Sequence, residues 1–222
     1  METEHDAGRE WLRGLAVFAG RLPGFDPASA PADPVRLFTA WLTEAVAEGV
    51  REPHAMTLST VDAEGAPDAR VLILKGVDTS GWQFATHALS PKGGQLTARP
   101  QAALTFYWPD LGRQVRVRGA VAPGTAEESA ADFLARSPAA RAEALTGRQS
   151  RRVDGPEAGP DDALAEAVAR IEREPSLVDP AWTRYTLAAT RVEFWQASPD
   201  RSHVRLRYDR DGGRWERYRV RA

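Results

Sequence analysis

Residues Arg70–Lys92, RVLILKGVDTSGWQFATHALSPK, form the stretch on which the predicted fold depends. Four aliphatic residues, Val71–Leu74, stand between two cations, and such a run predicts a buried strand. Gly76–Gly81 supplies turn-forming residues, and Trp82–Thr86 predicts the returning strand of a hairpin. The stretch therefore predicts two antiparallel strands with charged and polar groups at their ends.

The polar groups of this stretch have the chemistry of a phosphate site. Arg70 and Lys75 bracket the first strand, while Thr86, Ser90 and Lys92 follow the second. A phosphate is held by cations for charge and by hydroxyl and N–H groups for directional hydrogen bonds. Two ordinary solvated strand ends would show the same pattern, and this stretch alone favours that simpler interpretation.

Composition narrows the class of protein. A chain of 222 residues and 24.3 kDa allows one domain with a sizeable core, or two small domains. A net charge of −2 predicts no nucleic-acid or membrane partner, and the absence of cysteine excludes disulfides, thiolate metal sites and cysteine nucleophiles. The polar N-terminus and the lack of a long apolar run predict a cytoplasmic protein without signal peptide or membrane span. No metal site is predicted.

The chain is predicted to consist of an arm and one domain. Residues 1–32 form the arm or lid, with a short helix at Arg9–Phe18 and a segment rich in proline, glycine and alanine after it. The domain spans residues 33–222 and opens with a helix, for which Asp33 is the N-cap and Pro34 the first residue. Gly49 ends that helix.

The remaining elements alternate between strands and short helices. Further strands are predicted at Ala55–Val61, Gln101–Trp108, Arg113–Ala122, Thr186–Ala197, Val204–Tyr208 and Trp215–Val220. Helices are predicted at Gly93–Thr97, Ala126–Arg136, Ala139–Arg152 and Asp161–Glu174, with a loop at residues 155–160. Consecutive strands joined by short turns predict an antiparallel sheet, most simply a barrel.

Several separated motifs occur in a fixed order along the chain. They are RVLILK (70–75), FATH-x₂-S-x-K (84–92), FYWP-x₃-RQV (106–115), RQS (148–150), EFWQ (193–196) and R-x-H-x-RLRY (201–208). Together, from about Asp33 to Tyr208, the chain resembles the pyridoxamine 5′-phosphate oxidase family of FMN enzymes. The resemblance implies a mainly β fold with flanking helices: a six-stranded antiparallel split barrel that works as a homodimer, with FMN at the dimer interface.

The resemblance also implies roles for individual residues. Arg70, Lys75, Thr86 and Lys92 would hold the FMN phosphate and ring edge, and Val71, Leu72, Ile73, Leu74 and Ala85 are further cofactor-binding residues. Gln114, Gln149, Ser150, Trp195 and Arg205 would complete the flavin site, some of them from the other subunit. Arg201 and His203 would lie over the flavin as catalytic and substrate-binding residues, and Lys75 and Arg136 would hold a substrate phosphate.

Physical chemistry supports part of this assignment and leaves alternatives for the rest. A cation beside the flavin N1–C2 edge would stabilise the reduced ring. Arg201 and His203 are separated by one residue, so on a strand they would point to the same face. Each of these residues also has a simpler interpretation. Gln114 could lie on the solvent face of an alternating strand, Trp195 could be part of the core, and His203 could have a structural role.

The chain departs from the family pattern at the phosphate loop and at the proposed substrate end. Pro91 stands where the family commonly has an arginine before the lysine of the phosphate loop, and Asp132 and Ala140 stand where the vitamin-making enzymes place a tyrosine and a serine for the substrate phosphate. The arm, residues 49–53 and the FATH motif are similar to the phenazine-biosynthesis flavin oxidases, whereas Lys75 matches the vitamin-making branch.

These observations predict an FMN-dependent oxidase. A hydride would pass from a small aromatic substrate, such as pyridoxamine or pyridoxine 5′-phosphate, to the flavin, and O₂ would then reoxidise the flavin. One alternative is an oxidase of a dihydrophenazine-type or other specialised metabolite. A second alternative is a flavin- or haem-binding split-barrel protein without turnover, against which the presence of Arg201 and His203 argues.

Overall fold

A curled antiparallel sheet is the central element of the computed structural model, which describes residues 2–18, 20, 22–150, 152 and 162–221. Within these residues the strands are β1 (Ala55–Val61), β2 (Pro67–Ile73), β3 (Gly76–Asp78), β4 (Gly81–His87), β5 (Gln101–Trp108), β6 (Arg113–Pro123), β7 (Trp182–Gln196), β8 (Val204–Asp211) and β9 (Arg214–Val220). Burial alternates along β1 and β5, and both strands have the ends that the sequence predicted.

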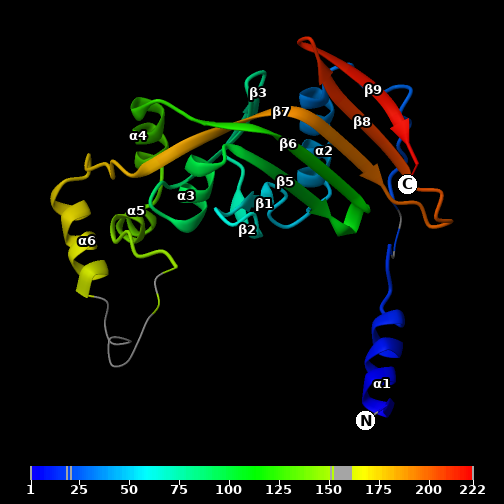
Figure 1. Cartoon of the computed structure of the whole chain (residues 1–222), viewed down its shortest axis with the longest axis horizontal. Helices are drawn as coiled ribbons and strands as arrows, with labels where there is room; N and C mark the ends of the chain where they lie inside the picture. The colour runs from blue at the N-terminus through cyan, green and yellow to red at the C-terminus, as the bar shows by residue number, and fades with distance from the viewer. Residues whose placement is uncertain (1, 19, 21, 151, 153–161, 222) are drawn as a thin grey trace.

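The strands follow one another across the sheet in the order β2-β1-β5-β6-β7-β4-β3, and β8 and β9 extend it from β7 (Figure 1). Among the described residues β2 and β3 are not paired, so the sheet forms an open half-barrel. The predicted mainly β, antiparallel fold with flanking helices is confirmed. The predicted number of six strands is wrong, because β3 is a separate short strand and the β8–β9 hairpin lengthens the sheet.

The predicted hairpin between Val71–Leu74 and Trp82–Thr86 is also wrong. Strand β2 pairs with β1 along its whole length, whereas β4 pairs with β3 and β7. The intervening residues make their own tight hairpin, in which the Ser80 backbone N–H donates to Asp78 Oδ1 at 2.7 Å. Because β2 is an edge strand, Val71 is 66% exposed rather than buried.

The core lies between the sheet and α2 (Pro34–Ala47). Asp33 caps this helix as predicted: its side chain accepts a hydrogen bond from the Val35 N–H. Phe38 is fully buried, and its ring contacts Trp82, Phe106 and Trp108 at centroid distances of 5.6, 4.8 and 6.4 Å. This aromatic cluster fixes α2 against the strands that lead toward the polar residues described below.

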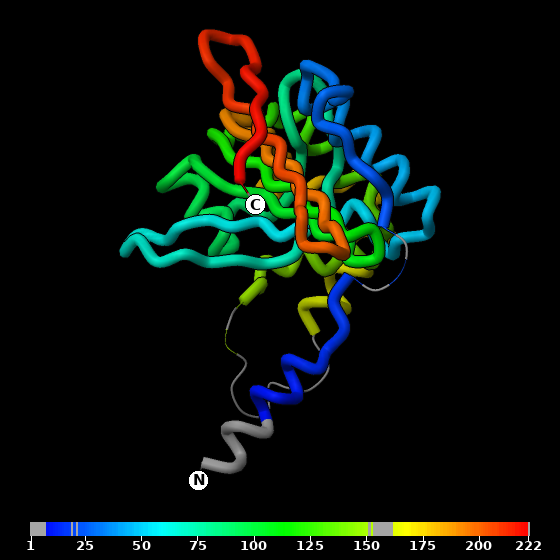
Figure 2. Tube along the Cα trace, turned by 90° about the vertical axis from the view of Figure 1, so that its right-hand side faces the viewer, coloured from blue at the N-terminus to red at the C-terminus, as the bar shows by residue number. Residues whose placement is uncertain are grey.

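The other helices are α1 (Glu2–Arg13), α3 (Pro91–Ala98), α4 (Ala126–Leu134), α5 (Pro138–Leu145) and α6 (Asp162–Arg173). Helix α1 stands away from the sheet in both views (Figures 1 and 2). It begins before the predicted start at Arg9. It also ends before the predicted end at Phe18, because Gly14 follows its last turn. Helix α5 likewise ends at Leu145, not at residue 152, and the loop predicted at 155–160 lies outside the described residues.

Candidate functional site

A cavity of about 310 Å³ opens between β2, the start of α3 and residues 149–150. It brings together residues that are far apart in the sequence: Arg70, Val71, Leu72, Lys92, Gln149 and Ser150, together with Asp68, Ala69 and Pro91. The first six of these were predicted as cofactor-binding residues, and the structure places them around one space. Their assignment to a cofactor remains a prediction.

Lys92 is a buried cation in the first turn of α3. Ser90 caps the helix by accepting a hydrogen bond from the Gly93 N–H, which fixes the backbone beside Lys92. The Lys92 side chain is held by neutral oxygens, since its Nζ donates to Gln149 Oε1 at 2.6 Å and to Ser90 Oγ at 3.4 Å. Burial lowers the pKa of Lys92, and the charge of Arg70 lowers it further. A bound anion would favour the charged form of Lys92 and so oppose both effects.

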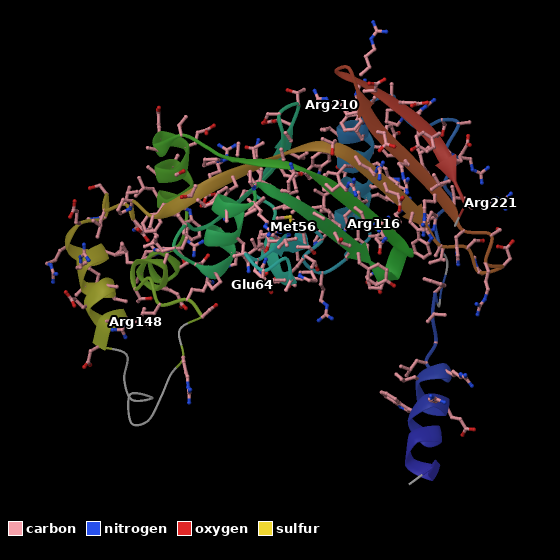
Figure 3. The ribbon with its side chains drawn as sticks, viewed as in Figure 1. Met56, Glu64, Arg116, Arg148, Arg210 and Arg221 are labelled. Carbon is pink, nitrogen blue, oxygen red and sulfur yellow. The ribbon has the colours of Figure 1, made fainter. Side chains whose placement is uncertain are left out.

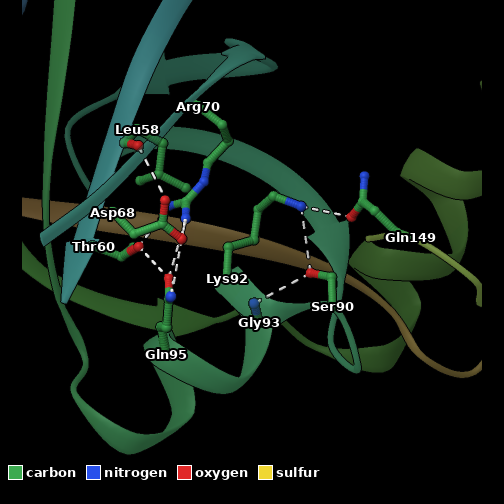
Figure 4. A network of polar contacts seen from close by, with 9 residues as sticks. All are labelled: Leu58, Thr60, Asp68, Arg70, Ser90, Lys92, Gly93, Gln95 and Gln149. Carbon is green, nitrogen blue, oxygen red and sulfur yellow. Dashed lines mark hydrogen bonds and ion pairs between the residues drawn. The ribbon is translucent and has the colours of Figure 1, made fainter. Parts of the chain in front are cut away.

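Arg70 is fixed in place by partners on three elements (Figure 4). Its guanidinium donates to Thr60 Oγ1 at 2.5 Å and to Gln95 Oε1 at 3.2 Å, and it forms an ion pair with Asp68. Thr60 also donates to Gln95 Oε1, at 2.5 Å, so the three side chains form one network. Both cations therefore face the cavity from well-defined positions.

Sequence reasoning missed Asp68, Thr60 and Gln95. Asp68 lies two residues before Arg70 on β2, and the period of a strand was a usable signal that both point to one face. No comparable signal existed for Thr60, which faces Asp68 across the β1–β2 ladder, or for Gln95 on α3, because their proximity arises only in the folded chain.

A second polar cluster surrounds Lys75 and includes residues from α4 and β7. Lys75 Nζ lies 3.8 Å from Asp132 Oδ1, and Trp182 Nε1 donates to Asp132 Oδ2 at 2.8 Å. Arg136 lies over the Trp182 ring, 4.1 Å from its centroid, and donates to the Ala140 carbonyl at 3.0 Å. Burial lowers the pKa of Arg136, although the nearby Asp132 opposes that change. The cluster thus combines two cations with one carboxylate.

The remaining predicted residues of the Lys75 region are mostly buried. Ala85 and Thr86 lie on β4, and Ala85 packs against Phe133 and Trp182 in a small apolar cluster. Leu74 belongs to the main core, next to Ile73 at the end of β2. These positions shape the walls of the region and present little side-chain surface.

A third group lies on neighbouring strands β6, β7 and β8. Gln114 is the register partner of Trp195, which in turn is the register partner of Arg205. The His203 ring lies against Trp195 at a centroid distance of 5.0 Å. No hydrogen bond or ion pair among the described residues joins this group to the Arg70–Lys92 cavity. In Figure 1, α3 and the ends of β7 and β8 near residues 195–205 lie toward different ends of the sheet.

Arg201 and His203 do not lie on a strand, so the shared strand face considered for them does not apply. Strand β8 begins only at Val204, and Arg201 has a left-handed backbone with φ of 65°. The preceding loop is organised by Asp200, which accepts hydrogen bonds from Ser198 and Ser202. His203 Nδ1 accepts from the Ser198 N–H at 3.0 Å, so the loop itself orients the imidazole.

Glu193 supports the third group from within the sheet. It is 2% exposed, and its carboxylate accepts from Arg116 at 2.6 Å and from Arg207 at 2.8 Å, with Arg205 Nε 3.6 Å away. Burial by itself would raise the pKa of Glu193, but the hydrogen bonds from Arg207 and Arg116 hold the pKa below its ordinary value. Arg116 is exposed on β6 (labelled in Figure 3), and Glu193 keeps this arginine cluster in place.

Two family models match the chain. Residues 42–173 match the model described as pyridoxamine 5′-phosphate oxidase, and residues 182–221 match the model of the pyridoxine 5′-phosphate oxidase C-terminal dimerisation region. The chain belongs to the pyridoxamine 5′-phosphate oxidase family, a family of FMN-dependent oxidases. Among the described residues, no helix has the length and apolar character that a membrane crossing requires.

Curated relatives and solved structures agree with this membership. The chain is 44% identical over 199 residues to a pyridoxine/pyridoxamine 5′-phosphate oxidase of Pseudomonas paraeruginosa, covering 89% of this chain and 92% of the relative. It is 45% identical over 188 residues to an oxidase of the same name from Bordetella petrii, covering 84% and 88%. The structure of PhzG from Burkholderia lata, in complex with tetrahydrophenazine-1-carboxylic acid, superposes with a TM-score of 0.82 at 30% identity, covering 91% of this chain and all of PhzG.

Proposed function

We propose that the protein is a homodimeric oxidase that holds the phosphate of FMN between Arg70 and Lys92. The observation that carries this proposal is the buried Lys92, whose Nζ has no carboxylate within ion-pair distance among the described residues. The donor set suits a phosphomonoester dianion, because two cations line the same cavity and the Ser90 hydroxyl lies beside the Lys92 ammonium. The start of α3 adds a favourable partial charge for an anion.

The homodimer is supported by the separation of the predicted site residues. Trp195 and Arg205 lie in the segment that matches the dimerisation region, and they do not contact the Arg70–Lys92 cavity in their own chain. In the proposed dimer, Gln114, Trp195 and Arg205 of the partner subunit complete each flavin site. Arg201 and His203, next to Trp195, then face the substrate.

FMN bound at this site would supply the redox chemistry, taking a hydride from the substrate and returning the electrons to O₂. The protein's own residues position the groups. Arg70 and Lys92 hold the phosphate, Arg205 places a positive charge beside the ring, and the His203–Trp195 pair limits where a flat substrate can lie. No residue of the chain has to act as a nucleophile in this proposal.

The first expected result is that the purified protein is yellow, elutes as a dimer and releases FMN on denaturation. Light scattering should give twice the chain mass of 24.3 kDa, with flavin absorbance under the same peak. The released cofactor is identified by chromatography against FMN, FAD and riboflavin. A colourless protein that takes up no added FMN would refute the proposed cofactor, and a monomer that binds FMN tightly would refute the shared site.

The substrate proposal depends on Asp132. We propose that this oxidase turns over pyridoxine and pyridoxamine 5′-phosphates poorly compared with a flat aromatic substrate that lacks a phosphate. Asp132 lies 3.8 Å from Lys75 and is held there by Trp182, so it offsets the cation expected to bind a substrate phosphate. PhzG, the similar structure in complex with an aromatic carboxylic acid, supports this second substrate class.

Asp132→Asn is expected to raise kcat/KM for the 5′-phosphates by about tenfold, the scale of one charge-assisted hydrogen bond. The amide keeps an acceptor for Trp182 but removes the negative charge beside Lys75. Steady-state O₂ uptake measures the effect, and Asp132→Tyr combined with Ala140→Ser should also raise turnover. Glu127→Gln, which removes a carboxylate from the first turn of the same helix, is the control. Efficient wild-type turnover of the phosphates, unchanged by Asp132→Asn, would contradict the proposal.

A further inference from the structure

We propose that Asp68 is an internal competitor for the anion in the Arg70–Lys92 cavity and that it selects for phosphomonoester dianions. The inference rests on the proposed function, since FMN is taken as the ligand that brings the dianion. In the structure, the carboxylate of Asp68 takes the place at Arg70 that a phosphate oxygen would take. Binding then requires Asp68 to release Arg70.

The geometry places Asp68 in the site itself. Its side chain lines the cavity together with Arg70, Lys92 and Gln149. Asp68 Oδ2 accepts hydrogen bonds from Arg70 and from Gln95 Nε2, the latter at 3.1 Å (Figure 4). The Asp68 side chain is 47% exposed, so it can turn toward solvent without opening the core. Displacement by a ligand is therefore sterically simple.

The exchange is proposed at the Nη2 end of the Arg70 guanidinium. One end of the guanidinium donates to the neutral oxygens of Thr60 and Leu58, at 2.5 and 3.5 Å, and lies toward the β1 backbone. The other end, which carries Nη2, bonds Asp68 and Gln95. A ligand oxygen that bonds Nη2 from the cavity would take the place of the Asp68 carboxylate.

The balance of charge explains the selectivity. The hydrogen bond from Gln95 lowers the pKa of Asp68, with Arg70 acting in the same direction, so the carboxylate is ionised at neutral pH. Arg70 and Lys92 together carry two positive charges, of which Asp68 offsets one. A dianion can neutralise both cations after Asp68 has left. A singly charged group only exchanges one anion for another and gains little.

The test compares the wild type with Asp68→Asn after removal of bound flavin. Titrations followed by quenching of flavin fluorescence give the dissociation constants of FMN and riboflavin, which differ by the phosphate. We expect Asp68→Asn to tighten FMN binding by about tenfold and to leave riboflavin binding unchanged. Glu64→Gln, which removes a carboxylate from the turn of the same β1–β2 hairpin (Figure 3), should change neither constant.

A second measurement separates this inference from the proposed cofactor. Inorganic phosphate should raise the Tm of Asp68→Asn more than that of the wild type, whether or not FMN binds. Unchanged FMN affinity in Asp68→Asn, or equal tightening of FMN and riboflavin, would overturn the inference while leaving FMN as the cofactor. If neither protein binds FMN, the proposed function fails. The Tm measurement with inorganic phosphate then decides alone whether Asp68 competes with anions.

Discussion

Replacing Lys92 with methionine is expected to raise the dissociation constant of FMN by about tenfold to a hundredfold. Methionine retains the apolar stem that fills the 6% exposed position, so the change removes mainly the charge. A charge-assisted hydrogen bond to a phosphate contributes roughly 1.5–3 kcal/mol, and Gln149 Oε1 also loses the Lys92 donor, 2.6 Å away. Titration of flavin-free protein with FMN measures the effect.

Two further variants show whether the loss in Lys92→Met is specific. Lys92→Arg should recover part of the affinity, because a guanidinium restores the charge in a less suitable shape. Arg99→Met removes a cation at the other end of α3, where its guanidinium bonds the Ala63 carbonyl at 2.9 Å, and should leave FMN binding unchanged. Equal FMN affinity in the wild type and in Lys92→Met would show that the phosphate lies elsewhere.

Gly93→Ala is expected to destabilise the protein by about 3 kcal/mol, the upper part of the range for overpacking a tight site. A Cβ at Gly93 would lie 2.2 Å from the Ala88 carbonyl oxygen and 2.7 Å from that of His87, both backbone atoms that cannot turn aside. The start of α3 would have to move away from the end of β4. Because Lys92 and Gln95 belong to the same helix, FMN affinity should fall as well.

The neighbouring Gly94 provides a matched control for this prediction. A Cβ at Gly94 meets no atom within 4 Å, so Gly94→Ala should be neutral or stabilise the protein by about 0.5–1 kcal/mol through helix propensity. Chemical denaturation of both variants compares the two free energies of unfolding. Similar free energies for Gly93→Ala and Gly94→Ala would mean that α3 does not pack against β4 as described.

The sequence was most informative where local chemistry determines structure. Asp33 and Pro34 located the start of α2. The alternation in Ala55–Val61 and the apolar and aromatic residues of Gln101–Trp108 located two strands with their correct ends. It failed where pairing partners are chosen by the whole fold. The residues of Val71–Leu74 and Trp82–Thr86 have strand character, but nothing within them shows that β2 pairs with β1 and that β4 pairs with β7.

The candidate site, too, was predictable where motifs mark its residues and unpredictable where the fold brings residues together. Arg70 and Lys92 were identified through motifs, and the structure places them at one cavity. The contacts of Asp132 with Lys75 and Trp182 were not predicted, since they join three segments that are distant in sequence. The backbone of Arg201 was not predicted either. Asp200 organises a turn before β8 begins, and Arg201 has a left-handed backbone in it. The spacing of Arg201 and His203 in the sequence does not reveal this turn.

The network around Arg70 also determines when conformational entropy is lost. An unrestrained arginine samples many rotamers, and immobilising such a side chain costs about 0.5–1.5 kcal/mol on binding. Thr60, Gln95 and the Leu58 carbonyl already restrict Arg70 to one orientation before any ligand arrives. The entropy of this side chain is therefore lost during folding, and an incoming ligand meets a preorganised guanidinium whose ordering no longer subtracts from its affinity.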